Sequence, residues 1–154
     1  MSLQETPYAK KRDWREKGDA LLVKGKYNDA IKAFDKAIEI NPQFKDAWLN
    51  KGNALVKLGK FEDAINALDK AIDIKPDSAD AWHNKGVALV GLGKPEDAIK
   101  ALDKAIEINP RDPDVWYNKS NALRLLGHTK EAYEALVKAK ELKHNIRRRT
   151  KRIL

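Results

Sequence analysis

The sequence contains no cysteine, a single methionine and no long apolar run. Without cysteine, the chain has no disulfide bonds, no zinc sites built on thiolates and no cysteine nucleophile. No stretch approaches the roughly 18 to 20 apolar residues that a membrane-spanning helix needs, and the first ten residues lack the apolar core of a signal peptide. We therefore expect a cytoplasmic protein with no membrane partner.

The sequence has little excess positive charge outside its C-terminal segment. The chain carries a net charge of +8, and six of these charges lie in residues 143–154, which hold no acidic residue. The other 142 residues therefore carry a net charge of only +2. Any general attraction to polyanions would have to come from the C-terminal segment, because the body of the chain is nearly neutral.

A fixed period is the most informative feature that is present. Four tryptophans stand 34 residues apart, at Trp14, Trp48, Trp82 and Trp116. Self-similarity at this period indicates stacked helical repeats. The expected organisation is an N-terminal segment, four repeats and a basic C-terminal segment, with bounds 1–10, 11–44, 45–78, 79–112, 113–146 and 147–154.

Within each repeat, apolar residues recur at spacings of three and four, which predicts two amphipathic helices. Glycine leaves a helix at positive φ with little steric cost, so one glycine per repeat is expected to end the first helix. These residues are Gly25, Gly59, Gly93 and Gly127. Proline stops the second helix in three repeats, at Pro42, Pro76 and Pro110, and His144 takes that place in the fourth.

Small residues complete the pattern, with an alanine at two places in every repeat. They are Ala30, Ala64, Ala98 and Ala132, and Ala37, Ala71, Ala105 and Ala139. Together with the tryptophans, glycines and prolines, these positions resemble the tetratricopeptide repeat family over residues 11–146. The resemblance implies an all-α fold, a right-handed superhelical solenoid of antiparallel helix pairs.

The resemblance also implies that the first helix of each pair lines the concave face of the superhelix. Asparagine then recurs at one place in three successive repeats, as Asn50, Asn84 and Asn118, with Asn53 and Asn121 nearby. A carboxamide offers one acceptor and two donors, so it can bind the carbonyl and amide groups of an extended peptide whatever its side chains. We expect an asparagine ladder that binds a peptide. The alternative is that these asparagines only follow the family consensus.

A row of carboxylates stands beside the asparagines, at Asp46, Asp80 and Asp114. Carboxylates on successive repeats lie too far apart to share one calcium ion, whose ligands lie at about 2.3 to 2.6 Å, so we expect no metal site. The row favours a basic ligand, and Leu49 and Tyr117 would add apolar contacts in the same groove. The alternative is a solvated helix face whose carboxylates pair with nearby lysines.

No catalytic constellation is present. His83, His128 and His144 occupy different parts of the repeat, so His83 is interpreted as an isolated surface residue. No strand precedes a glycine-rich loop, so no phosphate or cofactor site is expected, and the carboxylates on helix faces are expected to pair with residues such as Lys32, Lys36 or Lys70. The sequence therefore predicts a protein interaction scaffold with no enzymatic activity and no cofactor.

The C-terminal segment admits several interpretations. Ile146, Thr150, Ile153 and Leu154 share a helical spacing, so the segment is expected to form a short amphipathic helix that covers the last repeat. Its arginines could instead bind nucleic acid or another polyanion, or dock in the acidic groove of a second copy. The repeats could also be purely architectural, or self-associate through their terminal repeats. The sequence does not identify the protein or peptide partner.

Overall fold

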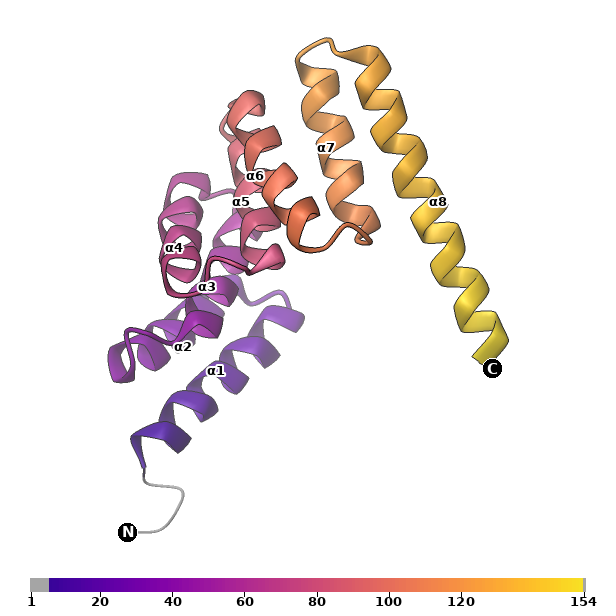
Figure 1. Cartoon of the computed structure of the whole chain (residues 1–154). Helices are drawn as coiled ribbons and strands as arrows, with labels where there is room; N and C mark the ends of the chain where they lie inside the picture. The colour runs from indigo at the N-terminus through magenta and orange to yellow at the C-terminus, as the bar shows by residue number, and fades with distance from the viewer. Residues whose placement is uncertain (1–5, 154) are drawn as a thin grey trace.

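The computed structural model describes residues 6–153, and the side chains of residues 6–150. The described chain folds into eight α-helices in four consecutive pairs, and Figure 1 shows the pairs stacked in sequence order. No strand occurs in residues 6–153, so the predicted all-α class is confirmed. The helices are α1 (Pro7–Val23), α2 (Tyr27–Ile40), α3 (Lys45–Lys57), α4 (Phe61–Ile74), α5 (Ala79–Gly91), α6 (Pro95–Ile108), α7 (Pro113–Leu125) and α8 (Thr129–Ile153).

The turn inside each helix pair depends on a glycine with positive φ. Gly25 has φ +72°, and its three equivalents, Gly59, Gly93 and Gly127, have φ between +70° and +77°. Next to Gly25, the N–H of Lys26 donates to the carbonyl of Leu21 at 2.9 Å and so satisfies one of the last carbonyls of α1. The prediction that these glycines end the first helices is confirmed.

The core of each pair is made of alanines and a few larger apolar side chains. In the second pair, Leu68 of α4 is fully buried and packs against the backbone of α3 at Gly52. A Cβ atom added to Gly52 would lie 2.6 Å from Cγ of Leu68, so only glycine allows the two helices to come this close. The fourth pair has Ser120 at the equivalent place, and its buried hydroxyl donates to the carbonyl of Ala132 at 2.7 Å.

The first helices of the pairs form a continuous inner layer, whereas the second helices are separated from one another. α3 contacts both α1 and α5, and α5 also contacts α7. Within the described residues, no Cα atom of α2 lies within 8 Å of α4, and the same holds for α4 with α6 and α6 with α8. The backbones of successive second helices are therefore spaced further apart than those of the first helices, which form one connected wall.

Two contacts that the sequence analysis missed join each repeat to the one before it. The indole N–H of Trp48 donates to the carbonyl of Pro42 at 2.8 Å, which ties the start of α3 to the loop after α2. The same bond recurs at the next two repeats, from Trp82 to Pro76 and from Trp116 to Pro110. Three of the four tryptophans thus fix the turn between repeats as well as packing within their own pair.

The second contact is a lysine that bonds to an aspartate of the preceding repeat. Lys51 lies 2.6 Å from Asp35, and Lys85 with Asp69 and Lys119 with Asp103 repeat this distance. Each lysine is only 22–23% exposed, so these pairs are less screened by solvent than a surface pair. The fourth repeat has Val137 where the others have this aspartate, so it offers no partner for the corresponding lysine of a further repeat.

The C-terminal segment is helical, but it is not a separate cap. α8 runs without a break from Thr129 to Ile153 and extends past the end of α7 (Figure 1). Ile146 is 49% exposed and residues 147–150 are exposed, so this part of α8 does not cover the last repeat. The expected short capping helix is therefore corrected to a continuation of α8. The side chain of Ile153 and all of Leu154 lie outside the described residues.

Candidate functional site

The predicted ligand wall is formed by α3, α5 and α7, which lie side by side in the inner layer. Asn50, Asn84 and Asn118 occupy the same place on these three helices, and all three side chains are partly buried. Asn53 and Asn121 lie one helical turn further on and are also partly buried. Equivalent places on neighbouring helices of the inner layer therefore carry carboxamides, in the order that the sequence predicts.

Two of the three asparagines hydrogen-bond to the preceding repeat. The Nδ2 atom of Asn50 donates to Oδ1 of Asp19 at 2.7 Å, and Nη1 of Arg15 donates to the other oxygen of Asp19 at 2.6 Å. Nδ2 of Asn118 lies 2.7 Å from Nε2 of His83. Asn84 makes no side-chain hydrogen bond within the described residues. The carboxamide of Asn84 and the Oδ1 atoms of Asn50 and Asn118 therefore have no protein partner on the wall.

The acidic row lies in the first turns of α3, α5 and α7. Asp46 pairs with its neighbour Lys45 at 2.7 Å, and Asp114 lies 3.5 Å from Lys143 of α8. Asp80, in the middle of the row, forms no ion pair with any described residue. Local pairing with lysines thus accounts for the two ends of the row and leaves its centre available to a cation.

His83 is better integrated than the sequence analysis supposed. Because the Nδ2 atom of Asn118 is a donor, Nε2 of His83 accepts in this arrangement and the ring proton resides on Nδ1. Burial lowers the pKa of His83 below its ordinary value of 6.5, although Asp112, Asp114 and Asp80 oppose this shift. A neutral His83 therefore joins α5 to α7. Only the geometry of the neighbouring helix reveals this contact.

The lowered pKa of His83 predicts a pH dependence of stability. The folded state binds a proton at His83 less readily than the unfolded state, so this group favours folding fully above about pH 6.5 and progressively less as the pH falls towards the folded pKa. We expect the urea midpoint to fall between about pH 7.5 and 5.5. The decrease should be smaller in His83→Gln, while His128→Gln and His144→Gln, both at exposed positions, should behave like the wild type. If the urea midpoint of His83→Gln fell with pH as steeply as that of the wild type, the lowered pKa of His83 would not be the cause.

Apolar side chains at the predicted positions remain partly accessible. Tyr117 of α7 is 50% exposed, and Leu49 of α3 is partly buried. Leu125, at the end of α7, is 55% exposed. Exposed aromatic and aliphatic groups beside amide and carboxylate groups are what a peptide-binding wall requires, because backbone bonds alone do not select a sequence.

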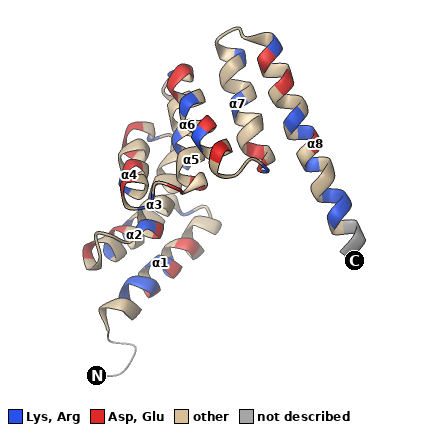
Figure 2. Cartoon of the chain, viewed as in Figure 1, with Lys and Arg blue, Asp and Glu red and all other residues tan. Residues whose placement is uncertain are grey.

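The basic residues concentrate in the last turns of α8. Figure 2 shows blue segments along α8, the last of them directly before the end that is drawn grey. Arg147, Arg148 and Arg149 are all exposed, and Lys143 is the residue that reaches Asp114. Three consecutive residues point in directions 100° apart on a helix, so these arginines do not form a single stripe.

Among the described residues, no three His, Cys, Asp or Glu side chains are grouped so that they could hold a metal ion. The same part of the chain contains no helix that combines the length and the apolar character needed to cross a membrane. His83, His128 and His144 stand on α5, at the start of α8 and near its end, and the structure does not bring them together.

Models described as TPR repeat match residues 18–59 and 52–93, and models described as Tetratricopeptide repeat match residues 79–112 and 101–134. No curated protein sequence matches the chain. These matches overlap and together cover residues 18–134, and the match to residues 79–112 coincides with the expected third repeat.

Among solved structures, the chain is similar to MamA 41-end from Desulfovibrio magneticus RS-1, with 26% identity, a TM-score of 0.81 and coverage of 88% of this chain and 76% of that one. A second MamA crystal structure has 25% identity and a TM-score of 0.82, over 90% and 81% of the two chains. A thermophilic TPR protein of Thermus thermophilus shares the fold, with 23% identity, a TM-score of 0.78 and coverage of 87% and 75%. The chain belongs to the tetratricopeptide repeat family.

Proposed function

We propose that the chain is a non-catalytic scaffold that binds an extended, basic peptide segment of a partner protein on the wall of α3, α5 and α7. The observation that carries the proposal is the central rung of this wall. Asn84 and Asp80 lie in the same turn region of α5, and neither has a bonding partner among the described residues. An amide and a carboxylate without partners, flanked by equivalent groups on both neighbouring helices, suit a ligand with backbone amides and a cationic side chain.

The spacing of the wall suits an extended chain. Neighbouring packed helices lie about 8 to 10 Å apart, and an extended peptide rises about 3.3 Å per residue, so one rung would meet the ligand about every third residue. Asn50 and Asn118 keep their donors engaged with the preceding repeat, so each would offer its oxygen to a peptide N–H. Asn84 would offer both donor and acceptor, which makes it the central contact.

The affinity expected from these contacts is moderate. Each net hydrogen bond contributes about 0.5 to 1.5 kcal/mol, so three rungs with apolar contacts at Leu49 and Tyr117 suggest micromolar rather than nanomolar binding. Such a wall would recognise the backbone and the positive charge of its ligand more strictly than its individual side chains.

Replacing Asn50, Asn84 and Asn118 together with alanine tests this function. We expect capture of partner proteins on immobilised protein, read by mass spectrometry, to fall about tenfold or more, because about 1.4 kcal/mol of lost binding energy already gives a factor of ten. Gln43→Ala with Asn145→Ala, exposed in the loop after α2 and on α8, is the control and should capture the partner normally. Unchanged capture by the triple variant would exclude the wall as the binding site.

Binding of a polyanion by the basic end of α8 is the competing function. Lys140, Lys143 and Arg147 stand at i, i+3 and i+7 and form a stripe on the helix, which favours this alternative. Deleting residues 147–154 separates the two functions. Under the peptide model the deletion leaves partner capture unchanged, whereas loss of capture together with loss of RNA or DNA binding at low salt would favour the polyanion.

A further inference from the structure

The outer side of the stack carries a hollow that recurs in every repeat. In each of the four repeats it is lined by a tryptophan, a lysine and a leucine of the first helix and by an acidic residue, an alanine and a lysine of the second. In the second repeat, the residues from α3 are Trp48, Lys51 and Leu55. At 100° per residue, these three lie on the side of α3 opposite to Asn50. The hollows therefore belong to a different face from the proposed peptide wall.

The hollow of the second repeat is the largest. It measures about 780 Å³, against about 390, 450 and 520 Å³ for the equivalent hollows of the first, third and fourth repeats. It reaches between α2 and α4, whose Cα atoms all lie more than 8 Å apart, and Ile31 and Asn28 of α2 form its far side. Its size also reflects a shorter side chain, because Asn66 stands where the other repeats have Lys32, Lys100 and Glu134.

The same substitution leaves a carboxylate without a partner. In the first and third repeats the lysine at this place pairs with the acid of the preceding turn, Lys32 with Asp29 at 3.8 Å and Lys100 with Asp97 at 3.1 Å. Asn66 cannot form such an ion pair, and Asp63 has none among the described residues. Within the described chain, the second repeat therefore presents an unpaired carboxylate, whereas the equivalent carboxylates of the first and third repeats form ion pairs.

A second departure from the repeat leaves a lysine without a partner. Lys36 pairs with Glu39 at 2.8 Å and Lys104 with Glu107 at 2.7 Å. The second repeat has Asp73 in place of these glutamates, one methylene shorter, and Lys70 forms no ion pair with any described residue. The expectation that Lys70 pairs with a carboxylate on its own helix face is therefore wrong. Lys60, immediately before α4, has no ion pair either.

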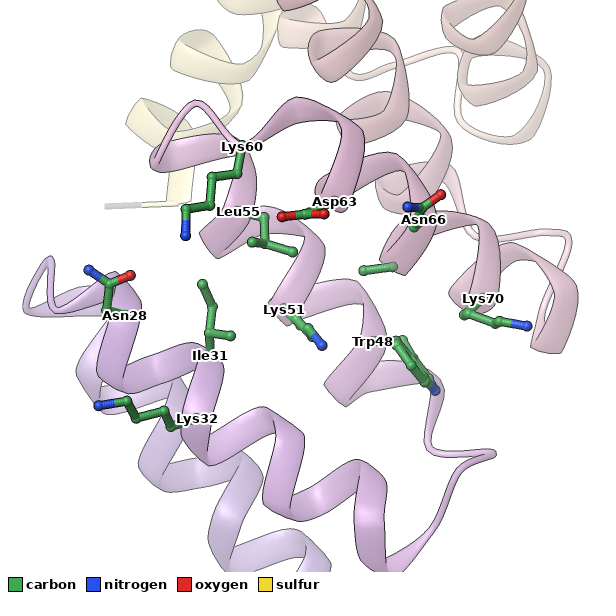
Figure 3. Close-up of a pocket in the computed structure, with 11 residues that line it drawn as sticks. Asn28, Ile31, Lys32, Trp48, Lys51, Leu55, Lys60, Asp63, Asn66 and Lys70 are labelled. Atoms are coloured by element: carbon green, nitrogen blue, oxygen red, sulfur yellow. The ribbon is translucent and has the colours of Figure 1, made fainter.

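Figure 3 shows how these groups surround the hollow. Ile31 and Leu55 point into it from opposite sides, with Trp48 beside them, so its floor is apolar. Lys60 extends over one end and Lys70 lies at the other end of α4. Lys51 is held inside by Asp35 at 2.6 Å and lies 5.4 Å from the centre of the Trp48 ring, so its charge is already compensated.

We propose that the hollow of the second repeat binds an acidic segment of a partner protein, in which two carboxylates flank an apolar side chain. The apolar side chain packs on Ile31, Leu55 and Trp48, and the carboxylates pair with Lys60 and Lys70. The two lysines stand ten positions apart, which is about 15 Å along a helix at 1.5 Å per residue. At about 3.3 Å per residue of extended chain, the two carboxylates stand four to five residues apart.

The composition of the lining favours an acidic peptide over a nucleic acid. Four lysines and one acid line the hollow, and Lys32 and Lys51 are already paired with aspartates outside the lining. Within the described residues, two unpaired lysines therefore remain against one unpaired acid, which favours an anionic ligand. The apolar floor would leave a phosphate backbone without contacts, whereas the apolar side chain of a peptide packs on it. In a peptide ligand, the backbone N–H groups supply donors for Asp63 and for the amide oxygens of Asn28 and Asn66.

The test is fluorescence anisotropy with a labelled synthetic peptide that carries two glutamates four residues apart, a leucine midway, and serine and glycine elsewhere. Lys60→Glu with Lys70→Glu should weaken binding to the full chain about tenfold or more, because both rim charges are reversed. The matched control, Lys94→Glu with Lys104→Glu, makes the same changes at the equivalent places of the third repeat and should alter the affinity by less than about twofold. Circular dichroism verifies that both variants are folded.

Three further measurements sharpen the result. Replacing the leucine of the peptide with serine should weaken binding, and Asp73→Glu, which gives Lys70 the partner that Lys36 and Lys104 have, should weaken it as well. The triple asparagine variant of the inner wall should bind this peptide normally, so this site and the proposed function fail independently. The proposal would be overturned by equal losses of affinity in the two charge-reversal variants, or by no loss in Lys60→Glu with Lys70→Glu. It would also be overturned if Lys60→Glu with Lys70→Glu weakened binding of a short RNA but not of the peptide.

Discussion

Gly52→Ala is expected to lower the free energy of unfolding by about 1 to 3 kcal/mol, the usual range for forcing an extra group into a packed core. In an exposed helix the same change would stabilise by about 0.8 to 1.0 kcal/mol, because alanine has the higher helix propensity. The sign reverses here because the new Cβ would lie 2.6 Å from Cγ of Leu68, whose side chain is fully buried. Urea unfolding followed by circular dichroism measures the difference.

A double-mutant cycle with Leu68→Ala isolates this contact. Leu68→Ala alone should cost about 2 to 5 kcal/mol, as truncations of buried leucines do. In Leu68→Ala the space facing Gly52 is empty, so adding Gly52→Ala should then cost little or stabilise. Stabilisation by Gly52→Ala in the wild-type background would show that α3 and α4 are not packed through this glycine.

Reversing the acidic row, with Asp46, Asp80 and Asp114 changed to lysine, is expected to weaken binding of a basic peptide about a hundredfold at low salt. A reversal replaces an attraction by a repulsion, and about 1 kcal/mol for each of three partly screened sites gives roughly that factor. A labelled peptide with a lysine at every third residue is the probe, read by fluorescence anisotropy. The ratio of the wild-type affinity to the variant affinity should become smaller at about 1 M salt, where the Debye length is only about 3 Å.

The control for this variant has the same net charge. Asp29, Asp63 and Asp97 stand at one place of the first three second helices, and all three are exposed. Changing them to lysine should leave the basic peptide bound within a few fold of wild type. If both triple variants lose affinity equally, net charge and not the acidic row governs binding.

The fold was predictable because its determinants are local and periodic. The tryptophan period set the frame, and α3, α5 and α7 begin at Lys45, Ala79 and Pro113, the first residues of the expected second to fourth repeats. Glycine at positive φ ended the first helices as predicted. Such signals depend on the residue and its neighbours in sequence, so no knowledge of the packing was needed.

The end of α8 was misjudged although a signal was present. Each earlier second helix ends two residues before a proline, whereas the fourth repeat has His144 at that place. Histidine keeps its backbone N–H and does not obstruct the preceding turn, so nothing stops the helix there. The predicted repeat boundary at residue 146 was set by the 34-residue period alone, whereas the helix continues beyond it because no proline interrupts it.

Contacts between repeats could not be predicted from helix faces alone. The bonds from Asn50 to Asp19 and from Asn118 to His83 join residues more than thirty positions apart, and they depend on how closely α1, α3, α5 and α7 pack. The lysines and aspartates of the pairs between repeats recur in the sequence with the same period, except that Val137 replaces the aspartate in the fourth repeat. The partner of each lysine emerged only when the helices were placed in space.

The most direct test of the account is a titration of isotope-labelled protein with the basic peptide, followed by amide chemical shifts. Saturable shifts are expected along the inner faces of α3, α5 and α7, and the side-chain amide of Asn84 should shift most, because it has no partner in the protein. Shifts confined to the outer hollows or to the end of α8, with the Asn84 side-chain amide unmoved, would contradict peptide binding by the inner wall.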